Sequence, residues 1–315
     1  HIMKPLNLIP IKPSLDFAGK RIIFFGFSIL LVLASIALFV ARDLNYGIDF
    51  QGGILIEVRV DKAGKLGEMR QQLSNLGLGE VALQEFGAPT DILIRIQKQE
   101  GGEKAQQAAI DKVKKELGPG VEYRRTEFVG PKVSEELFRD GVLAVVLAIV
   151  GILIYIWFRF EWQFGVGAVI ALCHDVLTTI GIFALTGIEF NLSTVAAILT
   201  IAGYSINDTV VVYDRVRENL RKYKTLSLFE LLNNSINETL SRTVMTSVTT
   251  LLALLSLYIL GGEVIRGFSF AMIWGVVIGT YSSVCLAVPL LLYLNVNRGT
   301  GRTKSDGEVA QEASS

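Results

Sequence analysis

The sequence predicts a polytopic α-helical membrane protein with six transmembrane helices and an inserted α+β domain of ferredoxin-like (β-α-β-β-α-β) order between helices 1 and 2. Two observations lead to this fold class. The chain is 51% hydrophobic and 19% charged, with a mean hydropathy of +0.47, which is more apolar than an ordinary soluble domain. The apolar residues are also concentrated in runs of about 20, the length that a helix needs to cross a bilayer.

Six apolar runs are long enough to span, and they set the expected order of the domains. The first two residues, 1–2, have the pattern of a cloning scar at the start of a cytoplasmic N-terminus, 1–21. A small, polar, disordered cytoplasmic tail is expected at 295–315. The predicted spans are 22–41, 141–158, 162–188, 190–213, 243–262 and 267–294.

The lysines and arginines of the short connections predict the orientation, because positively charged loops stay on the cytoplasmic side. The opposite connections hold only Glu189 in one and Glu263 with Arg266 in the other. Both termini are therefore expected in the cytoplasm, and the region 42–140 on the periplasmic side. The basic residues that share the cytoplasmic side are Lys4, Lys12, Lys20, Arg21, Arg159, Arg215, Arg217, Arg221, Lys222, Lys224, Arg242, Arg298, Arg302 and Lys304.

The region 42–140 is predicted to fold as a domain of its own. The motif "GIDFQGG" at its start precedes a strand and lacks the Gly-Lys-Ser/Thr of a phosphate loop, so we expect a tight turn there. Segments in which apolar and polar residues alternate, as in strands, then occur with segments of helical apolar spacing. Their order is β-α-β-β-α-β, the split βαβ arrangement. The predicted elements are strands at 53–60, 81–86, 91–97 and 121–129, and helices at 66–76 and 103–117.

The fourth connection, 214–242, has an amphipathic composition. It mixes several basic side chains with apolar ones such as Leu226, Leu228 and Phe229. This pattern favours helices that lie on the anionic inner surface of the membrane. Docking of a cytoplasmic partner is the alternative.

One carboxylic acid, Asp208, is the strongest candidate for a functional site. An ionised aspartate inside a bilayer costs about 2.5 to 3.5 kcal/mol on insertion scales, so it normally faces a bundle interior and marks an ion or proton path. Ser205 and Thr209 share its helical face. Arg242 begins the next span from the same side, so antiparallel packing brings it to a similar depth. We expect Asp208 to exchange a proton as Arg242 or water is supplied and withdrawn; a static pair that fixes helix packing is the alternative.

Further polar candidates in the spans are His174, Asp175, Asn207 and Thr246, and for the His174–Asp175 pair a packing role is favoured. No metal site is expected, because neighbouring helical residues point in different directions and no further His or Cys ligand spacing occurs. No cofactor is expected either. The chain has no GxSxG, HExxH or Walker motif, which argues against an enzyme. A net charge of +0 gives no reason to expect a nucleic-acid partner.

Several motifs, in their order and spacing, resemble the SecF family of bacterial protein-export subunits. They are "GIDFQGG" (47–53), "RFEWQ" (159–163), "ALCHDV" (171–176), "GYSINDTVVVYDRVREN" (203–219) and "SRTVMTSVTTLLALLSLYILGG" (241–262). The similarity runs from about Phe17 to about Leu294. It implies a six-helix unit of the resistance-nodulation-division type in the bacterial inner membrane. The intramembrane aspartate and arginine of that family fall on Asp208 and Arg242.

The resemblance also implies partners and a function. The expected partners are SecD, as a pseudo-symmetric heterodimer, the SecYEG channel and the SecA motor, with YajC and YidC, and a translocating preprotein on the periplasmic side. The expected function is to use the proton-motive force to promote export, with protons as the coupling ion. A purely structural subunit and half of a proton-driven small-molecule or lipid exporter remain as alternatives. The second half of a fused SecD–SecF chain would show the same motifs.

Overall fold

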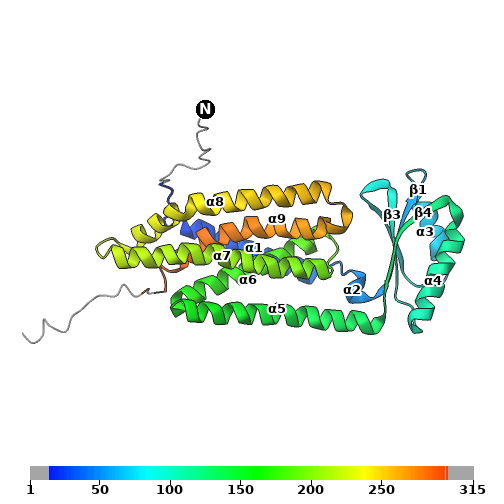
Figure 1. The fold of residues 1–315 in the computed structure, drawn as a ribbon, viewed down its shortest axis with the longest axis horizontal. Helices are drawn as coiled ribbons and strands as arrows, with labels where there is room; N and C mark the ends of the chain where they lie inside the picture. Colours follow the sequence, from blue (N-terminus) through cyan, green and yellow to red (C-terminus); the bar gives the residue numbers. More distant parts are fainter. Residues whose placement is uncertain (1–13, 295, 297–315) are drawn as a thin grey trace, which may run out of the picture.

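The computed structural model describes residues 14–294 and 296 as a long helical bundle with a small sheet domain beyond one end (Figure 1). The start of the first long helix and the end of the last one both lie at the opposite end of the bundle. The predicted cloning scar, most of the predicted N-terminus and all of the predicted disordered tail except Val296, which is buried, lie outside the described residues. The sheet domain therefore lies at one end of the bundle, and the start of the first span and the end of the last span lie at the other end.

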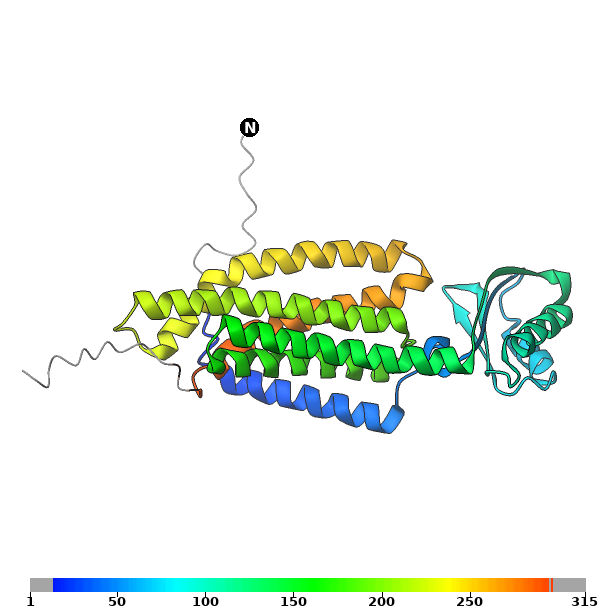
Figure 2. The same cartoon turned by 60° about the horizontal axis from the view of Figure 1, so that its bottom comes forward.

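Six helices in the described part of the chain are long and apolar enough to cross a membrane, which confirms the predicted fold class. Figure 2 shows α8 and α1 on opposite sides of the bundle, with other helices between them. The six helices are α1 (Arg21–Arg42), α5 (Pro131–Arg159), α6 (Trp162–Thr186), α7 (Leu192–Lys222), α8 (Leu228–Leu260) and α9 (Glu263–Ser282).

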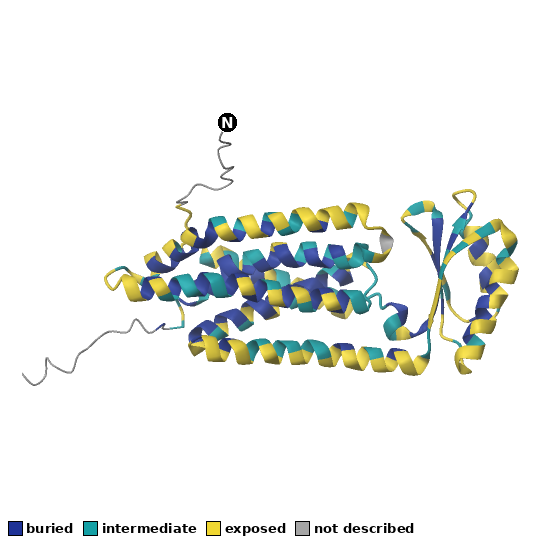
Figure 3. Ribbon diagram, viewed as in Figure 1, coloured by how far each residue is buried: buried dark blue, intermediate teal, exposed yellow. Residues whose placement is uncertain are grey.

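The helices differ in how far the protein itself covers them. The share of residues that the protein buries in the most apolar 18-residue stretch of each helix shows this difference. This share is 6% in α5 and 11% in α1, but 56% in both α6 and α7 and 72% in Val264–Leu290. Figure 3 shows the same contrast, with α5 largely exposed. A lipid-facing helix keeps apolar side chains exposed, whereas a helix that carries polar groups needs protein around them. The helices α6, α7 and α9 therefore form the centre of the unit.

The sheet domain has four strands and two covering helices. The strands lie in the order β2-β3-β1-β4 and each adjacent pair is antiparallel, so the order of elements is that of a split βαβ unit. Alternate side chains of β1 and β3, among them Ile56 and Ile94, pack on α3 and α4. The elements are β1 (Gly53–Val60), α3 (Leu66–Ser74), β2 (Val81–Phe86), β3 (Ala88–Ile96), α4 (Gly102–Leu117), η1 (Gly118–Gly120) and β4 (Val121–Val129), with α2 (Ile48–Gln51) before them.

Two connections differ from the sequence-based expectation. The helix α5 begins at Pro131, inside the region assigned to the domain, because proline at the first helical position favours a helix start. The predicted surface helices of 214–242 are instead the ends of α7 and α8. Some of their apolar side chains, such as Leu220 and Leu231, are buried in the same core as the bundle, whereas Phe229 stays 37% exposed.

The last span is irregular near its end. The helix α9 passes into a π-helical segment, η2 (Ser283–Ala287), and then into α10 (Val288–Leu290). Pro289 has no N–H to donate back into the helix, so regular α-helical bonding is interrupted at this point. Tyr213 of α7 donates its hydroxyl to the Ala287 carbonyl, 3.1 Å away, which provides one of the displaced backbone acceptors with a partner.

Close helix packing depends on glycine where α6 meets α1. A Cβ atom built on Gly181 would lie 2.6 Å from the Cα atom of Ser35, a separation that real Cβ atoms do not reach. Ser35 is itself 5% exposed. Small residues at membrane helix contacts allow this approach of backbones. Any larger residue at position 181 must push α1 away from the centre.

We predict that Gly181→Ala destabilises the unit by about 1 to 3 kcal/mol, the usual effect of overpacking a filled contact. The measurement is thermal unfolding of the full chain in detergent. Gly151→Ala on α5 is the matched control, because a Cβ atom there meets nothing within 4 Å. Equal melting temperatures for the two variants would contradict the packing described above.

A charged cluster on the open face of the sheet gives a pH-dependent prediction. Arg59 donates to both carboxylate oxygens of Asp91, at 2.6 and 2.8 Å, and this bonding holds the pKa of Asp91 below its usual range. Because the folded-state pKa is the lower one, the stabilisation is complete above the unfolded value of about 3.9 and is lost as the pH falls through the folded value.

Asp91→Asn is therefore expected to loosen β1 and β3 at neutral pH and to have little further effect in acid. Hydrogen exchange of peptides from the two strands, corrected for the intrinsic pH dependence of exchange, measures this in the full chain. A difference between variant and parent that grows on acidification would show that the cluster does not act in this way.

Candidate functional site

Asp208 lies near the middle of α7 and inside the bundle. Its residue is 4% exposed, and its Oδ2 atom is buried without a hydrogen-bond partner in the described structure. Ser205 and Thr209, the two residues predicted to share its face, are buried as well, whereas Asn207 is exposed. The helical face read from the sequence is therefore the face that turns inward, and Asn207 is not part of it.

Arg242 lies on α8 near Asp208 but does not form an ion pair with it. The two charges are close enough to interact through space, yet no nitrogen of Arg242 lies within 4.0 Å of the carboxylate, and the Arg242 residue is exposed. Thr246 is also exposed, and its hydroxyl donates to the Arg242 and Thr243 carbonyls of its own helix. A static Asp208–Arg242 pair is thus absent from this conformation.

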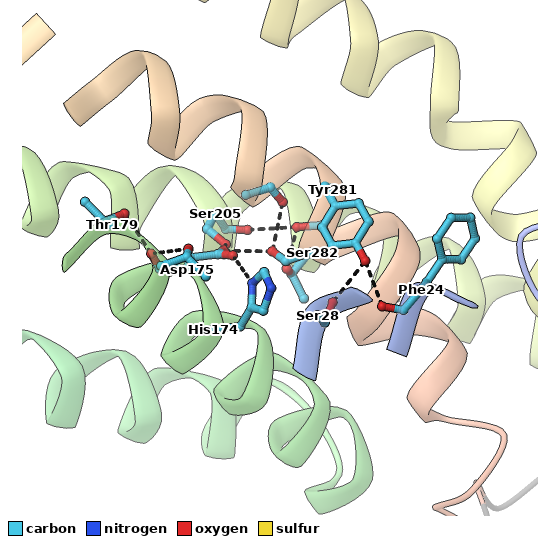
Figure 4. A network of polar contacts seen from close by, with 12 residues as sticks. Phe24, Ser28, His174, Asp175, Thr179, Ser205, Tyr281 and Ser282 are labelled. Carbon is cyan, nitrogen blue, oxygen red and sulfur yellow. Dashed lines mark hydrogen bonds and ion pairs between the residues drawn. The ribbon is translucent and has the colours of Figure 1, made fainter. Parts of the chain in front are cut away.

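Asp175 of α6 is the most heavily bonded carboxylate in the described bundle (Figure 4). It is fully buried. Its Oδ2 atom accepts a hydrogen bond from Ser205 of α7 at 2.5 Å and another from Ser282 of α9 at 2.7 Å. Hydrogen bonds to an ionised acceptor in a low-dielectric interior are short and strong. One carboxylate therefore joins the three central helices.

His174 supplies the third contact to this carboxylate. Its Nδ1 atom lies 2.9 Å from Asp175 Oδ1, so the expectation that the two side chains point in different directions is wrong. Adjacent helical side chains diverge at Cβ, but the imidazole ring is long enough to turn back to the neighbouring carboxylate. The Nε2 atom of the same ring is buried and has no hydrogen-bond partner among the described residues. Thr178 and Thr179 bond the Asp175 carbonyl and do not reach its carboxylate.

The π-helical segment completes the polar centre from the last span. Thr209 Oγ1 lies 2.8 Å from Ser283 Oγ, and Ser283 donates to the Ser205 carbonyl at 3.3 Å. Single π-turns in helices occur frequently at functional sites. Sequence reasoning did not identify Ser282 and Ser283, although two adjacent serines shortly before a proline in an apolar span were a usable signal. The site thus depends on three helices, α6, α7 and α9.

Tyr281 connects this centre to the outer helix α1. Its hydroxyl donates to the Phe24 carbonyl at 2.8 Å and lies 3.0 Å from Ser28 Oγ. The ring centroid is 6.0 Å from that of His174 (Figure 4).

Within residues 14–294 and 296, no group of three His, Cys, Asp or Glu side chains is placed to hold a metal ion. The side chains gathered at this centre are carboxyl, imidazole and hydroxyl groups, which can exchange protons and form hydrogen bonds.

Comparisons with known proteins place this architecture in one family. Residues 109–297 match the family described as "Protein export membrane protein SecD/SecF, C-terminal", and residues 37–63 match the "SecD/SecF GG Motif". The protein translocase subunit SecF of Cereibacter sphaeroides is 50% identical over 303 residues, covering 93% of this chain and 94% of its own length. That of Rickettsia rickettsii is 47% identical over 298 residues, with coverages of 93% and 96%.

Solved structures agree with the sequence relatives. SecDF of Thermus thermophilus, described as a translocon-associated membrane protein, superimposes with a TM-score of 0.82 at 36% identity and covers 91% of this chain. SecDF in a super-membrane-facing form gives 0.68 at 34% identity and covers all of it. This chain spans 39% and 41% of those two chains. The chain therefore belongs to the SecD/SecF family of protein-export membrane proteins, with the SecF subunits as its near full-length relatives.

Proposed function

We propose that this chain is an accessory subunit of the Sec preprotein translocase that works with SecD and uses the proton-motive force to promote export. The observation that carries the proposal is the Asp208 carboxyl, which is buried at the centre of the bundle with one oxygen lacking a protein partner. A carboxyl in this position is costly to hold as a bare charge. It therefore has a physical reason to take up a proton and, when water or Arg242 reaches it, to release one.

The two buried carboxyl groups of the site have different environments and so different roles. Asp175 accepts from two hydroxyl groups and contacts an imidazole, which satisfies its charge in place. Asp208 has no comparable set of donors. Two carboxyl groups in such different environments commonly have different functions in one site. We assign proton exchange to Asp208 and the positioning of α6, α7 and α9 to Asp175, with His174 as its partner.

Arg242 is assigned the role of a movable counter-charge. It is near Asp208 without touching it, and its exposed side chain is free to change position when α8 shifts relative to α7. Moving one charge across 100 mV is worth about 2.3 kcal/mol, or a roughly 40-fold change in a two-state equilibrium. A proton that crosses at Asp208 can therefore drive a substantial conformational shift.

The assembly and orientation are also proposals. The solved SecDF chains are more than twice as long as this one, so SecD is expected to supply the part of the assembly that this sequence does not contain. The excess of Lys and Arg at the bundle end away from the sheet supports cytoplasmic termini in the inner membrane. The sheet domain is then periplasmic, where it can meet SecD or a preprotein. Contacts with SecYEG, SecA, YajC and YidC would follow from the translocase role.

A structural role is the second candidate, and the Asp175 network favours it. Three central helices meet at one fully buried carboxylate, as a subunit that only stabilises SecD or the channel would also require. The two functions differ in what Asp208 must do. In a structural subunit it would carry no protons, and its replacement by a neutral residue of the same shape would be harmless.

We predict that Asp208→Asn abolishes the part of preprotein export that depends on the proton-motive force, because the amide has the shape of the carboxyl but no exchangeable acid proton. Export into inverted membrane vesicles, with and without a proton gradient, measures this. ATP-driven export without a gradient should remain at the parental level. Asn207→Ala is the matched control, since its side chain is adjacent but exposed.

Normal gradient-dependent export by Asp208→Asn would exclude the proton-coupling function and leave the structural one.

The Arg242→Ala variant distinguishes these two functions by a second measurement. A movable counter-charge predicts reduced coupling in complexes that still contain SecD, whereas a structural arginine predicts weaker assembly and unchanged coupling for each complex that forms.

For Asp175 we predict a stability effect that depends on hydrogen bonding. Asp175→Ala removes the acceptor of the Ser205 hydroxyl and one of the two acceptors of the Ser282 hydroxyl, which also bonds the Gly279 carbonyl. It should destabilise the unit by about 1 to 3 kcal/mol. Asp175→Asn keeps one acceptor oxygen and should recover most of the loss while retaining gradient-dependent export. Thermal unfolding in detergent and vesicle export test the two parts. Loss of coupling in a stable Asp175→Asn variant would mean that this carboxyl itself exchanges protons.

A further inference from the structure

The segment that leads from α1 into the sheet domain is bonded to the connection between α6 and α7. Gly47 donates its N–H to the Phe190 carbonyl at 2.9 Å, and Phe190 donates to the Asn45 carbonyl at 2.8 Å, so that Tyr46 and Phe190 form a parallel bridge. We call residues 45–49 together with 187–192 the joint. It lies at the end of the bundle that faces the sheet (Figure 1).

Asp49 binds the first turn of the helix that carries Asp208. Its Oδ2 atom accepts from the backbone N–H of Leu192, the first residue of α7, at 3.0 Å. The first N–H groups of a helix have no partner within the helix, and a negative charge at this end also complements the helix dipole. Asn191, the residue before the helix, already accepts from Thr194. Asp49 therefore provides a second cap that comes from a different part of the chain.

The sheet itself contacts the same connection. Arg95 of β3 forms an ion pair with Glu189 and donates to Asn45 Oδ1 at 3.1 Å. Asn45 in turn donates from Nδ2 to the Gly187 carbonyl at 2.9 Å. The first turn of α7, the connection before it and a central strand of the sheet are thus linked through one small set of polar contacts.

Three glycines of "GIDFQGG" occupy positions that favour glycine, and this close approach explains the first of them. A Cβ atom on Gly47 would lie 2.5 Å from Glu189 Oε1 and 3.1 Å from Asn191 Cβ. Gly52 and Gly53 have φ values of 72° and 122°, which favour glycine. A Cβ atom on Gly53 would also lie 2.5 Å from the Ile96 carbonyl oxygen. Gly47 therefore allows the close approach to the connection, and Gly52 and Gly53 allow the turn into β1.

Beside the joint, the open face of the sheet is separated from the bundle by a cavity of about 420 Å³. Leu55 and Arg125 line it from the sheet, and Ile188 and Val264 line it from the bundle. The space leaves the sheet room to tilt toward or away from the membrane helices. A tilt of this kind would pivot on the joint, where the polar contacts are concentrated.

We propose that the joint transmits displacements of α7 to the sheet domain and that Asp49 is the positioning residue that fixes α7 to it. This inference rests on the proposed function, in which α7 responds to the proton on Asp208. A shift of the first turn of α7 carries Leu192, and through Asp49 it carries the segment that enters β1. Asp49 takes no part in proton exchange at Asp208. Its replacement should therefore reduce gradient-stimulated export and leave proton flux unchanged.

The test compares variants of the full chain, assembled with SecD in proteoliposomes or inverted vesicles, by two readouts: proton flux and gradient-stimulated export. For Asp49→Ala we expect flux near the parental value and stimulation of export reduced about tenfold, the size of effect of one lost hydrogen bond to a charged acceptor. Asp49→Asn keeps an acceptor oxygen and should restore most of the stimulation. Asp61→Ala, an exposed acid in the same domain, is the matched control.

Gly47→Ala perturbs the joint by a different route. Its φ of −73° suits alanine, so only the contact with the connection is disturbed, and we expect the same separation of flux from export. Parental values of both readouts in Asp49→Ala and Gly47→Ala would overturn the proposal, and so would a parallel loss of both readouts. Asp208→Asn distinguishes the underlying function: if it leaves flux and export unchanged, the proton role itself fails, whatever the Asp49 variants do.

Discussion

The structure depends on how two carboxyl groups are accommodated inside an apolar bundle. Hydrocarbon offers no hydrogen bonds, so each acid must find partners within the protein or give up its charge. Asp175 finds them, and α6, α7 and α9 are drawn together around it. Asp208, one turn along α7 from Ser205, does not. Asp175 thus has hydrogen-bond donors in this conformation and Asp208 lacks them. In the proposed mechanism this difference favours a change of conformation when Asp208 gains or loses a proton.

Much of the architecture follows from local sequence patterns. The six spans follow from the length of the apolar runs, and the strand order along the chain and the inward face of α7 follow from the spacing of apolar and polar residues; a single sequence displays both. The Asp175 network does not, because its donors Ser205 and Ser282 lie on other helices and only the fold brings them together. In the connection 214–242 a single sequence likewise does not show which apolar residues are covered by neighbouring helices, as Leu220 and Leu231 are, and which stay exposed, as Phe229 does.

The helix α7 links the proposed proton site to the sheet domain. One end of the helix is held by Asp49 and Asn191 beside the sheet domain, and its middle carries the acid that we assign to proton exchange. A rigid helix transmits a displacement along its axis, whereas side-chain contacts across the bundle can rearrange. The irregular segment η2, bonded to Thr209 through Ser283, provides a place where the neighbouring span can yield as α7 moves.

In the proposed mechanism the Asp208 carboxyl gains and loses a proton while the complex works. Infrared difference spectroscopy of the assembled complex in membranes, with the Asp208→Asn spectrum subtracted, detects this change of protonation. We predict a protonated carboxyl band that appears and disappears when the proton gradient is reversed. A band, or an absence of one, that stays the same under both gradients would show that Asp208 does not exchange protons in the working complex.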